Sequence, residues 1–261
     1  ATSRLGGLDV LAATVERQTF RDFEVILVDY WWEERHGLLD LDRIPNLVHV
    51  PPRLGRWREM SDAHNAWNTG LALARGNVVC FLSDYWLAHP RYVEDHYQVW
   101  KDSGGRKMLS GQHDVRAMPE LASSSRSWLF SSFAEPIRDA VDAVTRTAGA
   151  PTLWSGNKAN MVGADPRGVA VHRFSYWAGC NESAPRLALY EVNGFDEEFD
   201  GGRQYGDVDL CARLERVGVS AICLPGDDRK NIRFNPHGLP SRATYGSAHR
   251  DIQKVHRPEN T

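Results

Sequence analysis

The chain has 261 residues, of which 42% are hydrophobic and 25% are charged, the composition of an ordinary globular protein. Its formal net charge of −3 gives no basic footprint and argues against nucleic acid as the principal partner. No apolar stretch reaches the ~20 residues that a transmembrane helix needs, and no signal peptide is recognisable, so the sequence predicts a cytoplasmic protein. The four cysteines are widely spaced, which favours buried thiols over a disulfide framework or a zinc site.

The N-terminal part alternates predicted helices and strands. Apolar residues recur at helical spacing from Leu8 and predict a first helix to about Gln18. The apolar segment 23–28 predicts a buried strand, which ends at Asp29, and a shorter strand is expected at 47–50. This order favours a parallel, right-handed strand–helix–strand arrangement.

The segment that follows contains the clearest strand of the chain. Ser61 is a suitable N-cap for a helix that Gly76 ends. The apolar run 78–82 is typical of a strand buried on both faces, and Ser83 and Asp84 follow it directly. Ligands of open α/β sheets bind beyond the carboxyl ends of strands, so Asp84 is expected to meet a ligand; alternatively, it only caps the next turn.

Regular alternation weakens between 112 and 171, which predicts a loop-rich insertion acting as a lid or a partner-binding lobe. Beyond it, Asp207 and Asp209 fall in the first turn of a predicted helix, where the helix dipole favours acidic side chains. A last buried strand is expected at 219–224, followed by a polar, histidine-rich tail.

Three blocks, taken together and in this order, resemble the inverting glycosyltransferases of family two, which have the GT-A fold. TFRDFEVILVD, at 19–29, resembles the strand whose terminal Asp contacts the nucleoside. NTGLALARGNVVCFLSDYWLAHP, at 68–90, resembles the family's helix, glycine turn, central strand and DxD region. The segment 178–218 resembles its acceptor-side block, which ends in the ED-x-D helix start.

The resemblance implies an α/β fold with a GT-A-type, Rossmann-like, mostly parallel sheet that is flanked by helices and carries an acceptor-side insertion. The nucleotide-sugar-binding half is expected at 1–111. The acceptor-binding and catalytic half is expected at 112–225, with its insertion at 112–171. The tail, 226–261, either folds back over the site as a lid or stays disordered.

The implied activity is that of a hexosyltransferase-like enzyme, which moves a sugar from a nucleotide diphosphate sugar, expected to be a UDP-sugar, to a carbohydrate or other hydroxyl acceptor with inversion. Asp207 occupies the position of the base that removes the acceptor proton; its alternative role is a helix N-terminal charge. Acceptor contacts are expected from Trp177, Asn181 and Asp209. Asp209 alternatively holds the helix start.

On the donor side, Asp29 is expected to bind the base or ribose, and Ser83 and Asp84 the ribose or a metal. Mn²⁺ or Mg²⁺ would neutralise charge on the leaving diphosphate, and His237 would join Asp84 as a ligand unless it is a structural histidine. The diphosphate itself is expected to meet basic side chains, although such cations are more often solvated surface charges. The candidates are Arg56, Arg58, Arg229 and Lys230.

The sequence departs from the family pattern at three points. Only one carboxylate follows the central strand, because Tyr85 stands where the principal metal-binding Asp is expected. Tyr205 and Gly206 replace the acidic pair before the base. The family's first strand, which precedes a turn like residues 2–4, is not found in the sequence.

Two other function classes therefore stay open. A catalytically silent relative would bind a nucleotide or a glycan as a recognition module. A nucleotidyltransferase would need a glycine-rich, lysine-containing phosphate loop after the first strand, and the chain has Gly6 and Gly7 but no lysine there.

Overall fold

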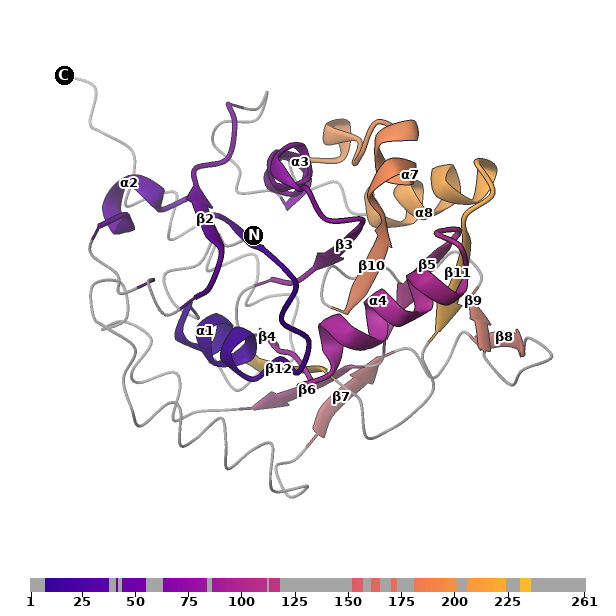
Figure 1. Ribbon diagram of the computed structural model, residues 1–261, viewed down its shortest axis with the longest axis horizontal. Coiled ribbons are helices and arrows are strands. Elements are labelled where there is room, and N and C mark those ends of the chain that lie inside the picture. Colours follow the sequence, from indigo (N-terminus) through magenta and orange to yellow (C-terminus); the bar gives the residue numbers. More distant parts are fainter. Residues whose placement is uncertain are drawn as a thin grey trace.

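The computed structural model describes residues 8–37, 41, 44–54, 63–83, 86–111, 113–117, 152–156, 161–164, 170–172, 181–200, 206–223 and 231–235. These residues form a mixed α/β fold, in which helices pack on small sheets (Figure 1).

The N-terminal unit consists of helix α1 (Leu8–Glu16), strand β1 (Val25–Val28), the short helix α2 (Trp32–Arg35) and strand β2 (Leu47–Val50). Strands β1 and β2 pair in parallel, with Val25 opposite Leu47. The apolar face of α1 packs against Leu27, because Leu8, Ala12 and Val15 recur at helical spacing. The predicted helix and both predicted strands are confirmed.

A second sheet has the strand order β11-β5-β10-β3. Its members are β3 (Val78–Phe81), β5 (Lys107–Ser110), β10 (Glu182–Pro185) and β11 (Ser220–Cys223). Strands β5 and β11 are parallel, whereas β10 is antiparallel to both β3 and β5. The end of β5 and the start of β10 lie side by side, because the amide of Gly111 donates to the carbonyl of Asn181 (2.7 Å). The expectation of a mostly parallel sheet is therefore wrong for β10.

Four helices and a short 3₁₀ turn surround this sheet. They are α3 (Ala63–Leu73), α4 (Tyr92–Asp102), α7 (Arg186–Glu191), α8 (Gly206–Arg216) and the turn η2 (Glu197–Phe199). Leu210 and Leu214, one helical turn apart on α8, are fully buried against Phe81 and Leu189. Figure 1 shows α7 beside β10 and α8 beside β11.

A further sheet contains β4 (Trp86–Leu87), β6 (His113–Ala117), β7 (Thr152–Gly156) and β12 (Asn231–Asn235), in the order β4-β12-β6-β7. Strands β8 (Met161–Ala164) and β9 (Ala170–His172) form an antiparallel pair. The described residues of the segment expected to be rich in loops thus form four short strands. Unlike β1 and β3, these strands are not continuous apolar runs, because polar residues or glycine interrupt them, so no strand pattern stands out in the sequence.

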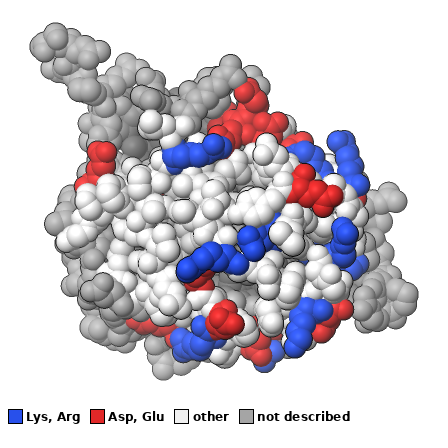
Figure 2. All heavy atoms as spheres, turned by 45° about the horizontal axis from the view of Figure 1, so that its top comes forward, with Lys and Arg blue, Asp and Glu red and all other residues white. Residues whose placement is uncertain are grey.

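The described surface carries charges of both signs. Lys and Arg side chains are interspersed with Asp and Glu on the face shown in Figure 2. Within the described ranges, no helix has the length and apolar character needed to cross a membrane.

Candidate functional site

Several polar side chains meet at the sheet edge where β3 and β5 end. Strand β10 begins there, with Glu182 opposite both Phe81 and Ser110. Burial raises the pKa of the Cys211 thiol, and the negative charges of Asp207 and Glu182 raise it further. Asp207, the base predicted from the sequence, and Glu182 therefore both lie within electrostatic range of Cys211, and Glu182 stands at the strand ends, where ligands of α/β proteins bind.

Asp207 is half-buried in the first turn of α8. Its Oδ1 accepts a hydrogen bond from the backbone amide of Val208 (2.9 Å). Burial raises the pKa of the Asp207 carboxyl, although the backbone bonds and the charge of His64 oppose this rise. A carboxylate with a raised pKa is a better proton acceptor, which is the property that a general base requires.

Glu182 is a second buried carboxylate at this edge, which the sequence interpretation missed. Its side chain is completely buried, and one oxygen accepts from the amide of Asn181 (2.9 Å). The only sequence signal was an acidic residue at the start of a short apolar segment. Burial of an acidic residue is uncommon without a specific role, so Glu182 joins the candidate site.

Asn181, predicted to contact the acceptor, is packed into the protein. Its Oδ1 lies 3.1 Å from Nε2 of His96, whose Nδ1 lies 2.7 Å from the hydroxyl of Ser183. A Cβ at Gly111 would collide with the amide group of Asn181, so the two residues pack closely. These contacts fix the entry to β10, and an acceptor role for Asn181 stays a prediction.

Asp209 takes part in an ion pair. The guanidinium of Arg213 donates to Asp209 (2.7 Å) and to the carbonyls of Val192 and Gly194 (both 2.6 Å). The arrangement ties α8 to the turn after α7, consistent with the alternative that Asp209 holds the helix start. Its contact with an acceptor stays a prediction.

Asp29 follows β1 directly, as expected, and is completely buried. It accepts from the amide of Trp31 (2.9 Å), and its Oδ2 lies 3.1 Å from Nε2 of His49 on β2. Trp32 stacks on His36 with ring centroids 3.8 Å apart. The carboxylate is thus held at the ends of the parallel pair, and a contact with the nucleoside stays a prediction.

The turn at 195–200 anchors the start of α3, which the sequence did not reveal. Glu197 accepts from Asn68 (2.8 Å) and pairs with Arg53. Asp200, buried, accepts from the amides of His64 (3.2 Å) and Asn65 (3.0 Å). A carboxylate at this position also interacts favourably with the helix dipole.

The remaining predicted site residues are placed as follows. Ser83 is half-buried just beyond β3. Outside the described residues lie Arg56, Arg58, Asp84, Trp177, Arg229, Lys230 and His237. Among the described side chains, no group of three or more His, Cys, Asp or Glu is arranged to hold a metal ion. The metal site therefore stays a prediction.

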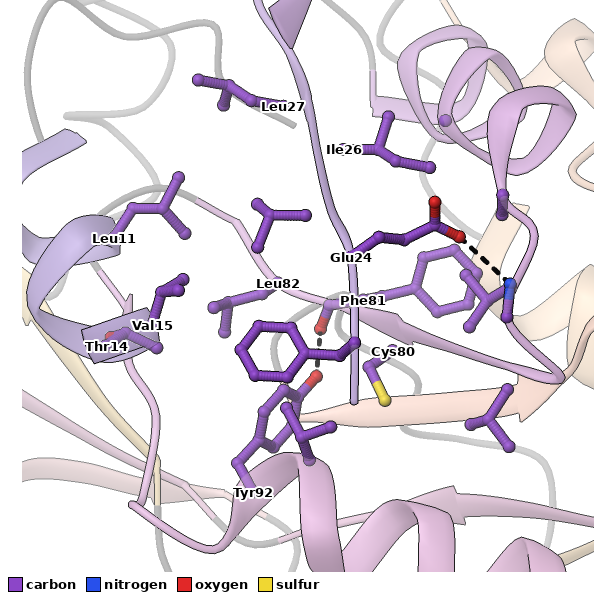
Figure 3. A pocket seen from close by; sticks show the side chains of 18 of the residues that line it. Leu11, Thr14, Val15, Glu24, Ile26, Leu27, Cys80, Phe81, Leu82 and Tyr92 are labelled. Atoms are coloured by element: carbon purple, nitrogen blue, oxygen red, sulfur yellow. Dashed lines mark hydrogen bonds between the residues drawn. The ribbon is translucent and has the colours of Figure 1, made fainter. Parts of the chain in front are cut away.

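A cavity of about 370 Å³ lies between β1 and β3 and is bordered by α1, α3 and α4 (Figure 3). Its lining is mainly apolar and includes Leu11, Val15 and Ile26. Every residue of β1 and of β3 contributes to the lining. Successive side chains of a strand point to opposite faces of a sheet. Because every residue of each strand lines the cavity, the cavity must lie against the edges of β1 and β3 and not against one face. Its character differs from that of the polar edge around Asp207.

This arrangement is that of an α/β protein with a polar site at the ends of its strands. No protein-family model and no curated protein matches the sequence. Among solved structures, the chain is similar to S. aureus TarS 1–349 in complex with UDP, with a TM-score of 0.50 and 12% identity over 97% of this chain and 62% of that chain. A second structure of S. aureus TarS gives a TM-score of 0.52 and 13% identity over 87% of this chain and 33% of that chain.

The chain thus spans less than two thirds of the length of either TarS structure. At this level of identity the likeness shows the fold alone, which is that of the S. aureus TarS structures.

Proposed function

We propose that the protein is a glycosyltransferase that transfers a sugar from a UDP-sugar to an acceptor hydroxyl with inversion. The observation that carries the proposal is the half-buried Asp207 in the first turn of α8, where burial raises the pKa of its carboxyl. The fold of the UDP-bound structure of TarS supports the donor class.

In the proposed reaction the carboxylate of Asp207 takes the proton of the acceptor hydroxyl. The hydroxyl oxygen forms a bond to the anomeric carbon from the face opposite the diphosphate. The bond from that carbon to the diphosphate oxygen breaks, and its electron pair leaves with UDP. Removal of the proton as the new bond forms typically contributes ~10²- to 10⁴-fold to the rate.

Donor binding is proposed for Asp29 and Ser83, together with Asp84, Arg56 and Arg58. Mn²⁺ or Mg²⁺, bound by Asp84 and His237, would supply positive charge beside the leaving diphosphate. The acceptor is proposed to be a carbohydrate or another hydroxyl compound, which Trp177, Asn181 and Asp209 would contact.

Isothermal calorimetry with UDP and GDP, each in Mn²⁺ and in EDTA, tests the donor class. We expect UDP to bind in a metal-dependent way and GDP to bind more weakly. Binding of neither nucleotide would contradict the proposal. Binding of UDP without any transfer or hydrolysis of UDP-sugars would favour a nucleotide-binding module that lacks catalysis.

Asp207→Asn tests the base. The substitution keeps the size of the side chain but removes its proton-accepting charge, so turnover should fall by ~10² or more while UDP affinity stays nearly constant. Glu215→Gln is the matched control, because it removes one negative charge from the same helix. Full activity of the Asp207→Asn enzyme would refute the assignment.

A further inference from the structure

The imidazole of His64 lies between Asp200 and Gly206, the residue that begins α8. Its Nδ1 lies 2.6 Å from Oδ1 of Asp200. Asp200 is also held by the amides of His64 and Asn65, so the carboxylate is fixed with respect to the ring. A carboxylate at this distance accepts the hydrogen of Nδ1, which leaves Nε2 directed away from Asp200.

The Nε2 side of the ring packs against Gly206, the first residue of α8. A Cβ at position 206 would lie within 3.0 Å of Nε2, Cε1 and Cδ2 of His64. Gly206 is not among the glycines with positive φ, so its backbone conformation does not demand glycine. The small residue is needed for space. The ring thus occupies the volume that a side chain directly before Asp207 would take.

Neighbouring aromatic rings keep the imidazole in place. Trp67 meets it edge-on with centroids 6.0 Å apart, and Phe195 lies at 5.5 Å. The His64 side chain is only 13% exposed. Rotation of the ring away from Gly206 would break the bond to Asp200 and disturb this cluster.

The charges around Asp207 come from three elements. His64 lies on α3 and its charge lowers the pKa of the Asp207 carboxyl, against the larger effect of burial. Cys211 and Glu215, on α8, and Glu182, at the start of β10, are further titratable groups of this cluster, and Asp200 is bonded to His64. Among these described groups, His64 is the one that can carry a positive charge.

We propose that His64, fixed by Asp200, is a positioning residue that keeps Asp207 oriented and ionised for proton removal from the acceptor. This role rests on the glycosyltransferase function proposed above. The pair of His64 and Asp200 takes the place of a side chain at position 206, where the sequence has glycine. The carboxylate that holds the ring comes from Asp200, seven positions before Asp207 and outside α8.

His64→Gln is the first test, because glutamine keeps a hydrogen-bond donor near Asp200 but places no ring against Gly206. The pKa of Asp207 is measured by carboxyl ¹³C NMR of the full chain. We expect the Asp207 pKa to rise in the variant, because the charge of His64 that lowers it is lost. This measurement requires neither donor nor acceptor.

Kinetics with the UDP-sugar form the second readout. We expect kcat to fall roughly ten-fold or more at unchanged donor KM, because displacement of a reacting group by about 1 Å can cost ~100-fold. The acidic limb of the kcat profile should move to higher pH, since a base with a higher pKa is protonated over a wider range. Gly206→Ala, whose Cβ displaces the ring, should shift both readouts in the same direction and replaces His64→Gln should that variant not fold.

Asn68→Ala is the matched control. Asn68 joins the same helix to the same turn, through the Phe195 carbonyl and Glu197 (both 2.8 Å), and its hydrogen bonds go to this turn and not to α8. It should lower the melting temperature and leave the Asp207 pKa and the pH profile unchanged.

The two proposals fail in different ways. An unchanged Asp207 pKa in both His64→Gln and Gly206→Ala, with kcat reduced no more than in Asn68→Ala, would overturn the positioning role while UDP binding and transfer remain. Absence of UDP binding with a raised Asp207 pKa would overturn the transferase function and leave the link between His64 and Asp207 intact.

Discussion

His96 should make the stability of the protein depend on pH. The side chain is 1% exposed, and burial lowers its pKa from 6.5 to about 4, against a smaller opposite effect of Asn181. The unfolded chain therefore binds a proton more readily than the folded protein, and stability falls as the pH drops from 6.5 toward 4. At ~1.4 kcal/mol per pKa unit, the loss attributable to His96 is about 2 kcal/mol at pH 5 and close to zero at pH 7.

The assay is urea unfolding followed by tryptophan fluorescence at pH 7 and pH 5, with His96→Gln as the comparison. Glutamine can still bond to Ser183 and Asn181 but does not titrate. Other histidines and carboxylates affect both proteins equally, so they cancel in the difference. We expect the wild-type protein to lose ~2 kcal/mol more than the variant over this interval. Equal losses would refute the neutral, buried state of His96.

Two further substitutions test the packing around the site. Gly70→Ala should stabilise the protein by up to about 1 kcal/mol in urea unfolding, because the position is inside α3 and the new methyl group would lie 3.5 Å from Val28 at the cavity wall. A loss of stability would contradict the description of that space. Arg213→Met should cost roughly 2 kcal/mol, since it strands Asp209 and the two carbonyls, whereas the exposed Arg216→Met should change stability by less than about 0.5 kcal/mol.

Local patterns were sufficient to predict the elements that deliver the candidate site. Apolar runs marked β1 and β3, and Asp29 and Ser83 lie just beyond the ends of these strands as expected. Apolar residues spaced one turn apart marked α8 and placed Asp207 in its first turn. These predictions succeeded because each depends on neighbours within a few positions of the chain.

Long-range pairing explains what the sequence did not reveal. His64 and Asp200 are 136 positions apart, and nothing near either residue indicates the other. Gly206 looked like the loss of an acidic partner before the base. In the structure it is the residue that makes room for an imidazole from α3, a reason that only the tertiary packing can supply.

Strand β3 shows how a correct element was assigned the wrong environment. Its apolar run predicted a strand buried on both faces, but Val78, Val79 and Cys80 are only half-buried. The strand pairs with β10, and the apolar cavity that it shares with β1 also borders these residues. The residues of β3 are thus as apolar as those of a fully buried strand. The described residues around them nevertheless leave three of the four only half-buried. Added apolar volume along this wall should therefore be tolerated better than elsewhere in the core.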